Sequence, residues 1–304
     1  MGDHYYDRGE LNSALKCYVR TRDYCTTPQH IIDMCLNVIK VNIEMNNFAH
    51  VLNYVGKAEQ NPGEIDPVTR GKLNVCSGLA HLENKKYKSA ARKFLHVNKE
   101  ISGNFSYVIS EKDIGLYACL CALAEFSREE LRTSILENPD FKFFLDLVPE
   151  LQQVISDFYN NKYSTALATL YRLRPELEID LHLHEHVSKI YEKIRAKSII
   201  QYFFPYSSVD IKLMAESFNT TPEELEKELA SMIVSDSIQA RIDSQNKVLY
   251  AKQVDQRSAT FRESIATGAK FEQTLKDMLL KMNLTENEFV VKPTKRGDRD
   301  ERDD

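Results

Sequence analysis

The sequence has no tryptophan and only ten glycines among its 304 residues. Its loops lack the glycine-rich pattern that cradles phosphates, and no Walker or dinucleotide-binding motif occurs. The longest apolar stretch, Ile114 to Ala124, is shorter than the roughly 20 residues that a membrane-spanning helix requires. We therefore expect neither a nucleotide-binding fold nor a membrane partner, and we interpret this stretch as a buried helix.

An excess of basic residues is also missing. The net charge of −5 argues against bulk electrostatic attraction to nucleic acid or to an anionic membrane. The six cysteines include no Cys-x-x-Cys pair, and most of them lie inside apolar helical patterns. Together with the lack of a secretory leader, this predicts reduced core thiols in a protein of the cytoplasm and nucleus.

Helical periodicity extends from the first residues to about Ser198, and an internal repeat is visible within it. Four segments that begin at Asp7, Glu44, Glu83 and Tyr159 align without gaps. Each segment is a polar turn, then a large apolar residue, then a smaller residue three positions later. The large residues are Leu11, Phe48, Tyr87 and Tyr163, and the smaller ones are Ala14, Val51, Ala90 and Ala166.

The spacing of these segments indicates the kind of repeat. The smaller residue recurs after 37, 39 and 76 positions, and 76 is two periods of 38, so a degenerate copy is expected at Phe126 to Leu131. This period predicts tetratricopeptide-like helical hairpins, in which the smaller residue lets two helices approach closely. We expect a mostly α fold that begins with a helical repeat solenoid. A non-repeating helical bundle with coincidental turns is the alternative.

The stretch from Arg195 to Tyr250 predicts a winged helix. Pro205 ends an apolar helix, and a short second helix carries an apolar stripe from Ile211 to Phe218. A third helix is expected to begin after Thr221, its N-cap. Apolar residues alternate on both sides of the polar turn at 244–246, which predicts a β-hairpin, the wing. The exposed strand edges of such a hairpin pair with other chains.

Many winged helices bind DNA, and the charge of this one bears on that alternative. Its third helix carries Glu223, Glu224, Glu226 and Glu228 against the single Lys227. The whole stretch from 187 to 252 has nine basic and nine acidic side chains. Such a surface would repel a phosphate backbone. A winged-helix nucleic-acid-binding protein is therefore the alternative from another class, and we expect no nucleic acid as partner.

Residues 255–282 predict one long C-terminal helix. Its apolar stripe steps by 4, 3, 3, 4, 3 and 4 positions along Phe261, Ile265, Gly268, Phe271, Leu275, Met278 and Met282. This spacing is typical of a helix that packs along other helices. We expect an intermolecular bundle, with docking onto its own chain as the alternative. Residues 283–304 are expected to be a disordered tail, which from Lys292 mixes five basic with five acidic side chains.

One histidine cluster suggests chemistry. His182 and His186 could share a helix face, but no third ligand stands at a recognisable distance, and a polar helix start is the simpler interpretation. Cys119 and Cys121 lie in an apolar run without a charged activator, which indicates core packing. We expect no catalytic residue, no metal ligand and no cofactor.

Helical repeats that lead into a winged helix and a terminal helix resemble the PCI-domain proteins. These are scaffold subunits of the proteasome lid, the COP9 signalosome and a translation initiation factor complex. The segments that carry the resemblance are residues 33–41, 115–124, 200–206, 218–221 and 249–258. They are most similar to the signalosome branch of the family, and the proteasome-lid branch is the nearest neighbour.

The resemblance implies a domain order. It places N-terminal helical repeats at 1–90 and the PCI domain at 91–252, which contains helical repeats at 91–186 and the winged helix at 187–252. The terminal bundle helix follows at 255–282 and the tail at 283–304. Family members usually carry further helices before the position equivalent to Met1, so functions of that arm are not expected here.

The resemblance also implies a function. It predicts a non-catalytic scaffold subunit of a complex that removes a ubiquitin-like modifier from the cullins of cullin-RING ubiquitin ligases, a reaction called deneddylation. A scaffold subunit of the proteasome regulatory lid is the alternative. The partners implied are other PCI subunits through the winged helix and the remaining subunits through the terminal helix. Cullin-RING ligases would be reached only indirectly.

Two groups of interface residues follow from the resemblance. The winged-helix edge is expected to use Ile238, Gln239, Arg241, Asp243, Val248 and Tyr250, with support from neighbours between Ile211 and Phe218. The bundle is expected to use Phe261, Ile265, Phe271, Leu275, Met278 and Met282.

Overall fold

The computed structural model describes residues 1–60, 66–98, 105–252, 256–287 and 289. The chain divides into two units, Met1–Tyr250 and Ala251–Asp304. Within the described ranges, no helix has both the length and the apolar character that crossing a membrane demands.

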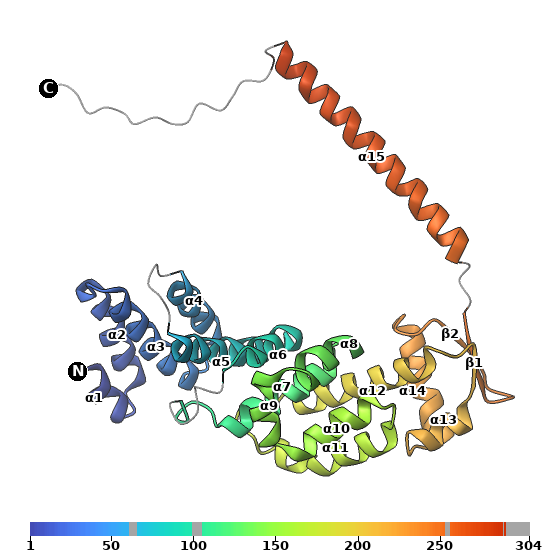
Figure 1. Cartoon of the computed structure of the whole chain (residues 1–304), viewed down its shortest axis with the longest axis horizontal. Coiled ribbons are helices and arrows are strands. Elements are labelled where there is room, and N and C mark those ends of the chain that lie inside the picture. Colours follow the sequence, from blue (N-terminus) through green and yellow to red (C-terminus); the bar gives the residue numbers. More distant parts are fainter. Residues whose placement is uncertain (61–65, 99–104, 253–255, 288, 290–304) are drawn as a thin grey trace. The chain divides into compact units, whose positions relative to one another are not determined.

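The first unit begins with helical hairpins that follow one another along the chain (Figure 1). They pair α1 (Gly2–Asp7) with α2 (Leu11–Arg20), α3 (Pro28–Glu44) with α4 (Phe48–Glu59), and α5 (Pro67–Glu83) with α6 (Tyr87–Leu95). The short 3-10 helix η1 (Thr21–Tyr24) connects the first hairpin to the second. The predicted solenoid is therefore present from the start of the chain.

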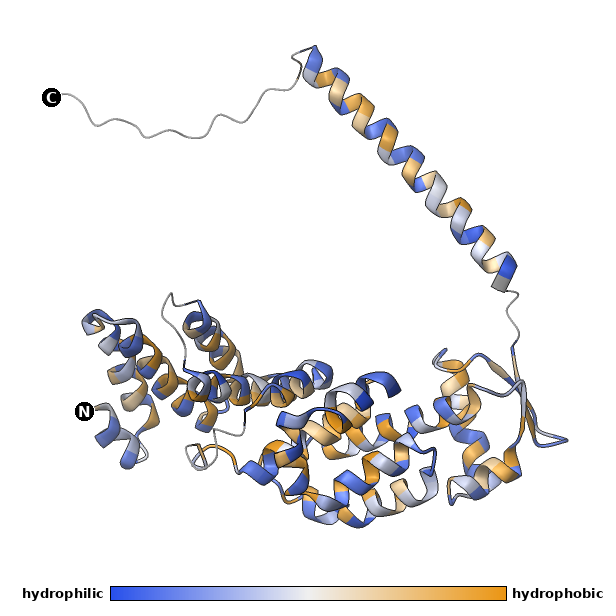
Figure 2. Cartoon of the chain, in the orientation of Figure 1, coloured by the Kyte–Doolittle hydropathy of each residue, from blue (hydrophilic) through white to orange (hydrophobic). Residues whose placement is uncertain are grey.

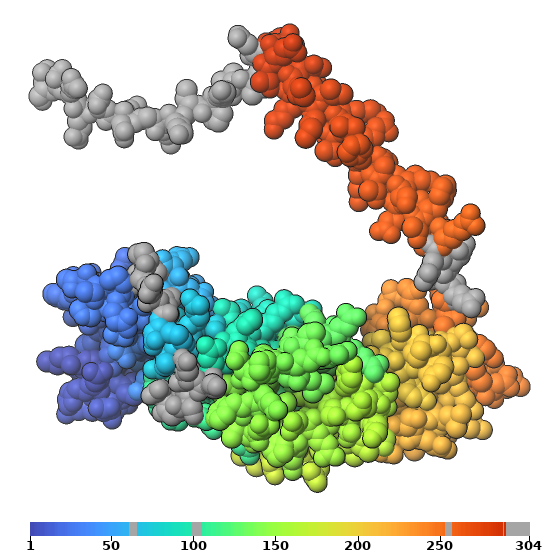
Figure 3. Space-filling view, in the orientation of Figure 1, coloured from blue at the N-terminus to red at the C-terminus, as the bar shows by residue number. Residues whose placement is uncertain are grey.

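Further helices continue this stack. They are α7 (Glu111–Glu125), α8 (Arg128–Leu131), the π-helical turn η3 (Arg132–Leu136), α9 (Pro139–Asp146), α10 (Pro149–Tyr159), α11 (Tyr163–Leu177) and α12 (Val187–Phe203). Helix α7 packs against α6 on one side and α12 on another, and α10 packs against α11. Figure 3 shows the helices of the first unit as one continuous packed body, with the colours in chain order.

The four predicted repeat turns share one backbone geometry. Each contains a residue in the left-handed region: Gly9 (φ 76°), Asn46 (57°), Lys85 (60°) and Asn161 (60°). The N–H of the following residue then donates to the carbonyl five positions earlier: Glu10 to Tyr5, Asn47 to Asn42, Lys86 to His81 and Lys162 to Asp157, at 2.8 to 2.9 Å. This is the Schellman arrangement that ends a helix. The repeat predicted from the gapless alignment is confirmed.

The smaller residue of each repeat lies where two helices meet. Ala14, Val51 and Ala90 are 0% exposed, and Ala166 is 1% exposed. A larger side chain at these positions would push the paired helices apart, because protein interiors are close-packed. The large residues Phe48, Tyr87 and Tyr163 are buried beside them.

The degenerate copy at Phe126 to Leu131 has a different turn. Phe126 is extended (φ −76°, ψ 145°), and α8 begins with a capping box. In that box the Ser127 side chain accepts from the Glu130 N–H at 3.2 Å, and the Glu130 carboxylate accepts from the Ser127 N–H at 2.9 Å. A helix therefore starts where the 38-residue period expects one. The Schellman geometry of the other four turns is replaced by an N-terminal cap.

Helix α7 is the central helix of the first unit. Cys119 and Cys121 on it are 0% exposed, which confirms their predicted core packing, and burial raises the pKa of Cys121 to about 12. Gly115 is required for close approach, because a Cβ there would lie 2.7 Å from the Phe144 carbonyl oxygen on α9. Figure 2 shows apolar residues gathered where neighbouring helices meet.

The winged helix closes the first unit. It consists of α12, β1 (Ser208–Asp210), α13 (Ile211–Ser217), α14 (Pro222–Val234), β2 (Ala240–Asp243) and β3 (Val248–Ala251). The three strands have the order β1-β3-β2, and β1 is antiparallel to β3, with Ser208 opposite Tyr250 and Asp210 opposite Val248. The helices and the hairpin were predicted, and β1 was not.

The buried side chains of the winged helix mostly match the predicted stripes. Ile211, Met214, Ala215 and Phe218 are at most 3% exposed. Thr221 caps α14 as predicted, since its hydroxyl accepts from the Glu224 N–H at 3.4 Å. On β3, however, Leu249 is fully buried, while Val248 and Tyr250 alternate with it on the other face.

The second unit contains α15 (Gln256–Glu286), a helix of 31 residues. It continues to Glu286, past the predicted end at Met282. Residues 288 and 290–304, which make up most of the predicted tail, lie outside the described residues. Apolar and polar residues intermix along the helix (Figure 2).

Candidate protein interfaces

Asp243 organises the turn of the wing. Its Oδ1 accepts from the backbone N–H groups of Gln245 and Asn246, each at 3.1 Å, and its Oδ2 accepts from Asn246 Nδ2 at 2.9 Å. The backbone hydrogen bond from Asn246 is the main cause that holds the pKa of Asp243 below its ordinary value. Lys247 then adopts φ 57°. A charged Asp243 therefore fixes the shape of the hairpin that a partner would meet.

Two acidic residues of α14 bind within the first unit. Glu226 Oε2 lies 2.6 Å from Lys247 Nζ, and the Ser244 hydroxyl donates to Glu226 Oε1. The Arg195 Nε–H donates a bifurcated hydrogen bond to the Glu228 carboxylate, with distances of 2.8 and 3.0 Å to its two oxygens. Two of the four glutamates that precede and follow Leu225 on this helix therefore connect it to the wing and to α12.

The sheet order decides which backbone groups are free for a partner. Strands β1 and β2 are the outer strands, and β3 lies between them. An outer strand has a row of N–H and C=O groups without a partner strand, and such a row accepts an added strand. The exposed backbone edges of this sheet are therefore Ser208–Asp210 and Ala240–Asp243.

The structure distributes the predicted winged-helix residues over different environments. Gln239 and Arg241 are exposed at the β2 edge, and Ile238 is buried. Tyr250 is 45% exposed and Val248 is half-buried. Both belong to the central strand, so only their side chains are available to another protein.

The predicted bundle residues all lie within α15. Phe261, Ile265, Phe271, Leu275, Met278 and Met282 have exposed side chains along this helix, as do Leu279 and Leu280. At 100° per residue the stripe from Phe261 to Met282 stays on one side of the helix. Leu279 and Leu280 widen the apolar surface toward the C-terminal end.

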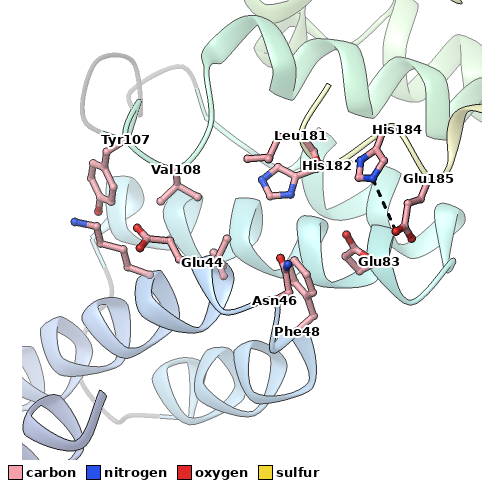
Figure 4. Close-up of a pocket in the computed structure, with 12 residues that line it drawn as sticks. Glu44, Asn46, Phe48, Glu83, Tyr107, Val108, Leu181, His182, His184 and Glu185 are labelled. Atoms are coloured by element: carbon pink, nitrogen blue, oxygen red, sulfur yellow. Dashed lines mark hydrogen bonds and ion pairs between the residues drawn. The ribbon is translucent and has the colours of Figure 1, made fainter. Parts of the chain in front are cut away.

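The three histidines of the cluster lie in two environments. His186 is the N-cap residue of α12, is 1% exposed, and places Nδ1 3.3 Å from the Tyr87 hydroxyl. Its Nε2 lies 3.7 Å from Glu83 Oε2. His182 and His184 precede α12 in a turn that lines a pocket (Figure 4). In the part of the chain that the structure describes, no three potential ligands converge on a metal position.

The sequence is similar to two family models and to known signalosome subunits. The family model of 26S proteasome subunit RPN7 matches residues 1–134, and the PCI domain model matches residues 151–253. COP9 signalosome complex subunit 1 of Arabidopsis thaliana is 49% identical over 296 residues, which cover 97% of this chain and 67% of that protein. The chain belongs to the COP9 signalosome subunit 1 family. The resemblance seen in the sequence is confirmed.

Two other relatives match the chain at lower identity. COP9 signalosome complex subunit 1b of Drosophila melanogaster is 41% identical over 302 residues, which cover 97% of this chain and 57% of that protein. A 26S proteasome non-ATPase regulatory subunit 6 of Oryza sativa is 23% identical over 262 residues, which cover 86% of this chain and 67% of that protein. The proteasome relative is more distant. The chain spans a little over half to about two thirds of the length of the two signalosome relatives.

Sequence reasoning missed one edge of this signalosome-family winged helix. Strand β1 contains a single buried apolar residue, Val209, between two exposed polar ones. Its three residues are too few for a recognisable strand pattern. The large exposed side chains of Tyr206 and Leu213 flank β1 in the sequence, and they are the signal that could have identified this surface.

Proposed function

We propose that this chain is a non-catalytic scaffold subunit of the COP9 signalosome, present in the cytoplasm and nucleus. In this role it supports the removal of a ubiquitin-like modifier from the cullins of cullin-RING ubiquitin ligases. The observation that carries the proposal is the 49% identity to a signalosome subunit 1 over nearly the whole chain. The chemistry of deneddylation is assigned to another subunit, and this chain contributes assembly.

The winged helix and α15 supply two separate means of assembly. The winged helix has exposed edges at β1 and β2, where Gln239 and Arg241 lie, and these edges suit a second PCI subunit that adds a strand. Helix α15 carries an apolar stripe that suits a bundle with helices of other subunits. Cullin-RING ligases then contact the assembled complex, so their link to this chain is indirect.

Affinity purification of the tagged full chain tests this function. Identification of the co-purifying proteins by mass spectrometry should yield signalosome subunits and cullin-RING components. Recovery of proteasomal ATPases in their place would assign the chain to the proteasome lid. As a second measurement, the purified chain alone should have no deneddylation activity, and the complex that contains it should have that activity.

A further inference from the structure

A pocket in the first unit is separate from both proposed assembly surfaces. It has a volume of about 530 Å³ and lies where the ends of α3 and α5 meet two loops. One loop precedes α7 and contains Tyr107 and Val108, and the other precedes α12 and contains Leu181 to Glu185 (Figure 4). We call it the Glu83 groove.

Hydrogen bonds to Asp180 hold the second loop in place. Asp180 Oδ1 accepts from the backbone N–H groups of His182 and Leu183, each at 3.0 Å, and from the Tyr117 hydroxyl at 2.6 Å. Tyr117 is a buried residue of the central helix α7. The groove is therefore preorganised, which lowers the entropic cost of binding.

One end of the groove has a lysine whose charge already has partners. Lys40 Nζ lies 3.8 Å from the centroid of the Tyr6 ring and 4.6 Å from that of the Tyr107 ring. Such cation–π contacts stabilise an ammonium group. Glu44 beside it accepts a hydrogen bond from the Tyr6 hydroxyl.

The other end has carboxylates without a cationic partner. Glu83 and Glu185 line the groove, and their ion-pair neighbours are histidines: His186 at 3.7 Å from Glu83 and His184 at 3.8 Å from Glu185. Among the described residues, no lysine or arginine lies within ion-pair distance of either carboxylate. The two carboxylates therefore have no direct ion pair with a lysine or arginine, and Lys189 interacts with Glu185 only at longer range.

His182 supplies a second and independent indication of a ligand. It is only 8% exposed, lines the groove, and lies among the labelled residues in Figure 4. Burial is the main cause that lowers its pKa, so the imidazole is neutral near pH 7 and has one donor and one acceptor. In the described part of the chain its ring nitrogens have no hydrogen-bond partner, although the His182 backbone N–H has one. These nitrogens are accessible from the groove, so a ligand bound there can hydrogen-bond to them.

Apolar side chains complete the groove. Phe48, Ile43 and Val108 lie along its lining, and Leu181 at the rim is 78% exposed. Leu181 therefore offers an apolar contact beside the carboxylates.

We propose that the Glu83 groove binds an extended peptide segment of a partner protein that carries an arginine or lysine next to an apolar residue. The basic side chain binds between Glu83 and Glu185, and the His182 imidazole hydrogen-bonds to the peptide. The neighbouring apolar side chain packs on Leu181. Charge complementarity selects this occupant, because an acidic segment would meet two carboxylates already lacking a cation.

Selection of random displayed peptides on the purified full-length chain tests the proposal. Enriched peptides should share a basic residue beside an apolar one. Replacement of the selected arginine by citrulline, which has nearly the same shape without the charge, should weaken binding at least about tenfold. The double variant Glu83→Gln with Glu185→Gln should weaken binding by a similar factor. The control Glu129→Gln with Glu176→Gln removes two exposed carboxylates elsewhere and should leave binding unchanged.

Several outcomes would overturn the proposal. They are the absence of enriched peptides, enrichment of peptides without a basic residue, and binding that is equal for arginine and citrulline. A chain that ends at Asn287 gives one more test. If it binds the selected peptides much more tightly than the full chain, the groove belongs to an arginine or lysine of the C-terminal tail of this same protein and not to a partner. None of these results depends on membership of the signalosome.

Discussion

Glu226 on α14 and Lys247 in the wing form an ion pair, with Oε2 and Nζ 2.6 Å apart. Ser244 donates a second hydrogen bond to the same carboxylate. The helix that would read DNA in a nucleic-acid-binding winged helix therefore uses a negative charge to hold its own wing. The hydrogen bond from Lys247 is the main cause that lowers the pKa of Glu226.

Substitution Glu226→Gln should loosen the wing at neutral pH. Because the folded-state pKa of Glu226 is lowered, its stabilising contribution is present above the unfolded pKa and is lost as the pH falls through the folded pKa. Hydrogen exchange of the β2 and β3 amides should be faster in the variant than in the parent at neutral pH, and the difference should vanish in acid. Glu223→Gln, on the exposed side of the same helix, is the control. Equal exchange in parent and Glu226→Gln at neutral pH would contradict the role of this pair.

The repeat was predictable because its determinants are local. Each hairpin needs one residue that tolerates the left-handed conformation, and glycine and asparagine fill that position in three of the four turns. Lys85 fills it in the remaining turn, which shows that the fixed spacing to Tyr87 and Ala90 was the stronger signal. The altered turn at Ser127 keeps the period and changes only the cap.

Enlarging a small repeat residue should destabilise the solenoid. Ala90 is 0% exposed on α6, which packs against both α5 and α7. Ala90→Leu should lower the free energy of unfolding by about 1–3 kcal/mol, because the added methylenes force side chains or backbone to move. Ala49→Leu on α4 places the same side chain at an exposed position and should change stability by less than about 0.5 kcal/mol. Urea denaturation measures both, and equal effects of the two variants would refute a packing role for Ala90.

The winged-helix edge was less predictable because it depends on pairing between distant residues. Strand β1 exists because Ser208 meets Tyr250 across the sheet, and three residues have no pattern of their own. That pairing also decides that β3 is central. The pairing also decides that Leu249 is buried and its neighbours Val248 and Tyr250 are not. From the alternation alone, either set of side chains could face the core. The interface roles of the predicted residues stay predictions.

Lys197 should give the chain a measurable pH dependence. Its Nζ donates to the Leu123 carbonyl at 2.6 Å, and burial lowers its pKa to about 8. The unfolded chain keeps this proton at higher pH than the folded chain does, so the free energy of unfolding rises as the pH increases above about 8. Relative to Lys197→Met, the parent should gain on the order of 2 kcal/mol between about pH 8 and pH 10.

Chemical denaturation across this pH range measures the Lys197 effect. Lys193→Met removes an exposed lysine of the same helix and keeps Lys197. The free energy of unfolding of this variant should therefore rise with pH as much as that of the parent. If the parent and Lys197→Met have parallel pH profiles, the ammonium group of Lys197 is not desolvated by the fold.

The apolar stripe of α15 should be needed for assembly and not for the fold of the first unit. Phe261→Asp with Leu275→Asp places two charges on the stripe, and the burial of two such side chains is worth roughly 1.5–3 kcal/mol each. Co-purification of other signalosome subunits should therefore fall by more than about tenfold, while circular dichroism retains the parent helicity. Ala266→Asp with Gln273→Asp adds the same charges on another side of the helix and should preserve co-purification. Loss of the fold in the stripe variant would mean that α15 packs on its own chain, because only an intramolecular contact couples that stripe to the stability of the first unit.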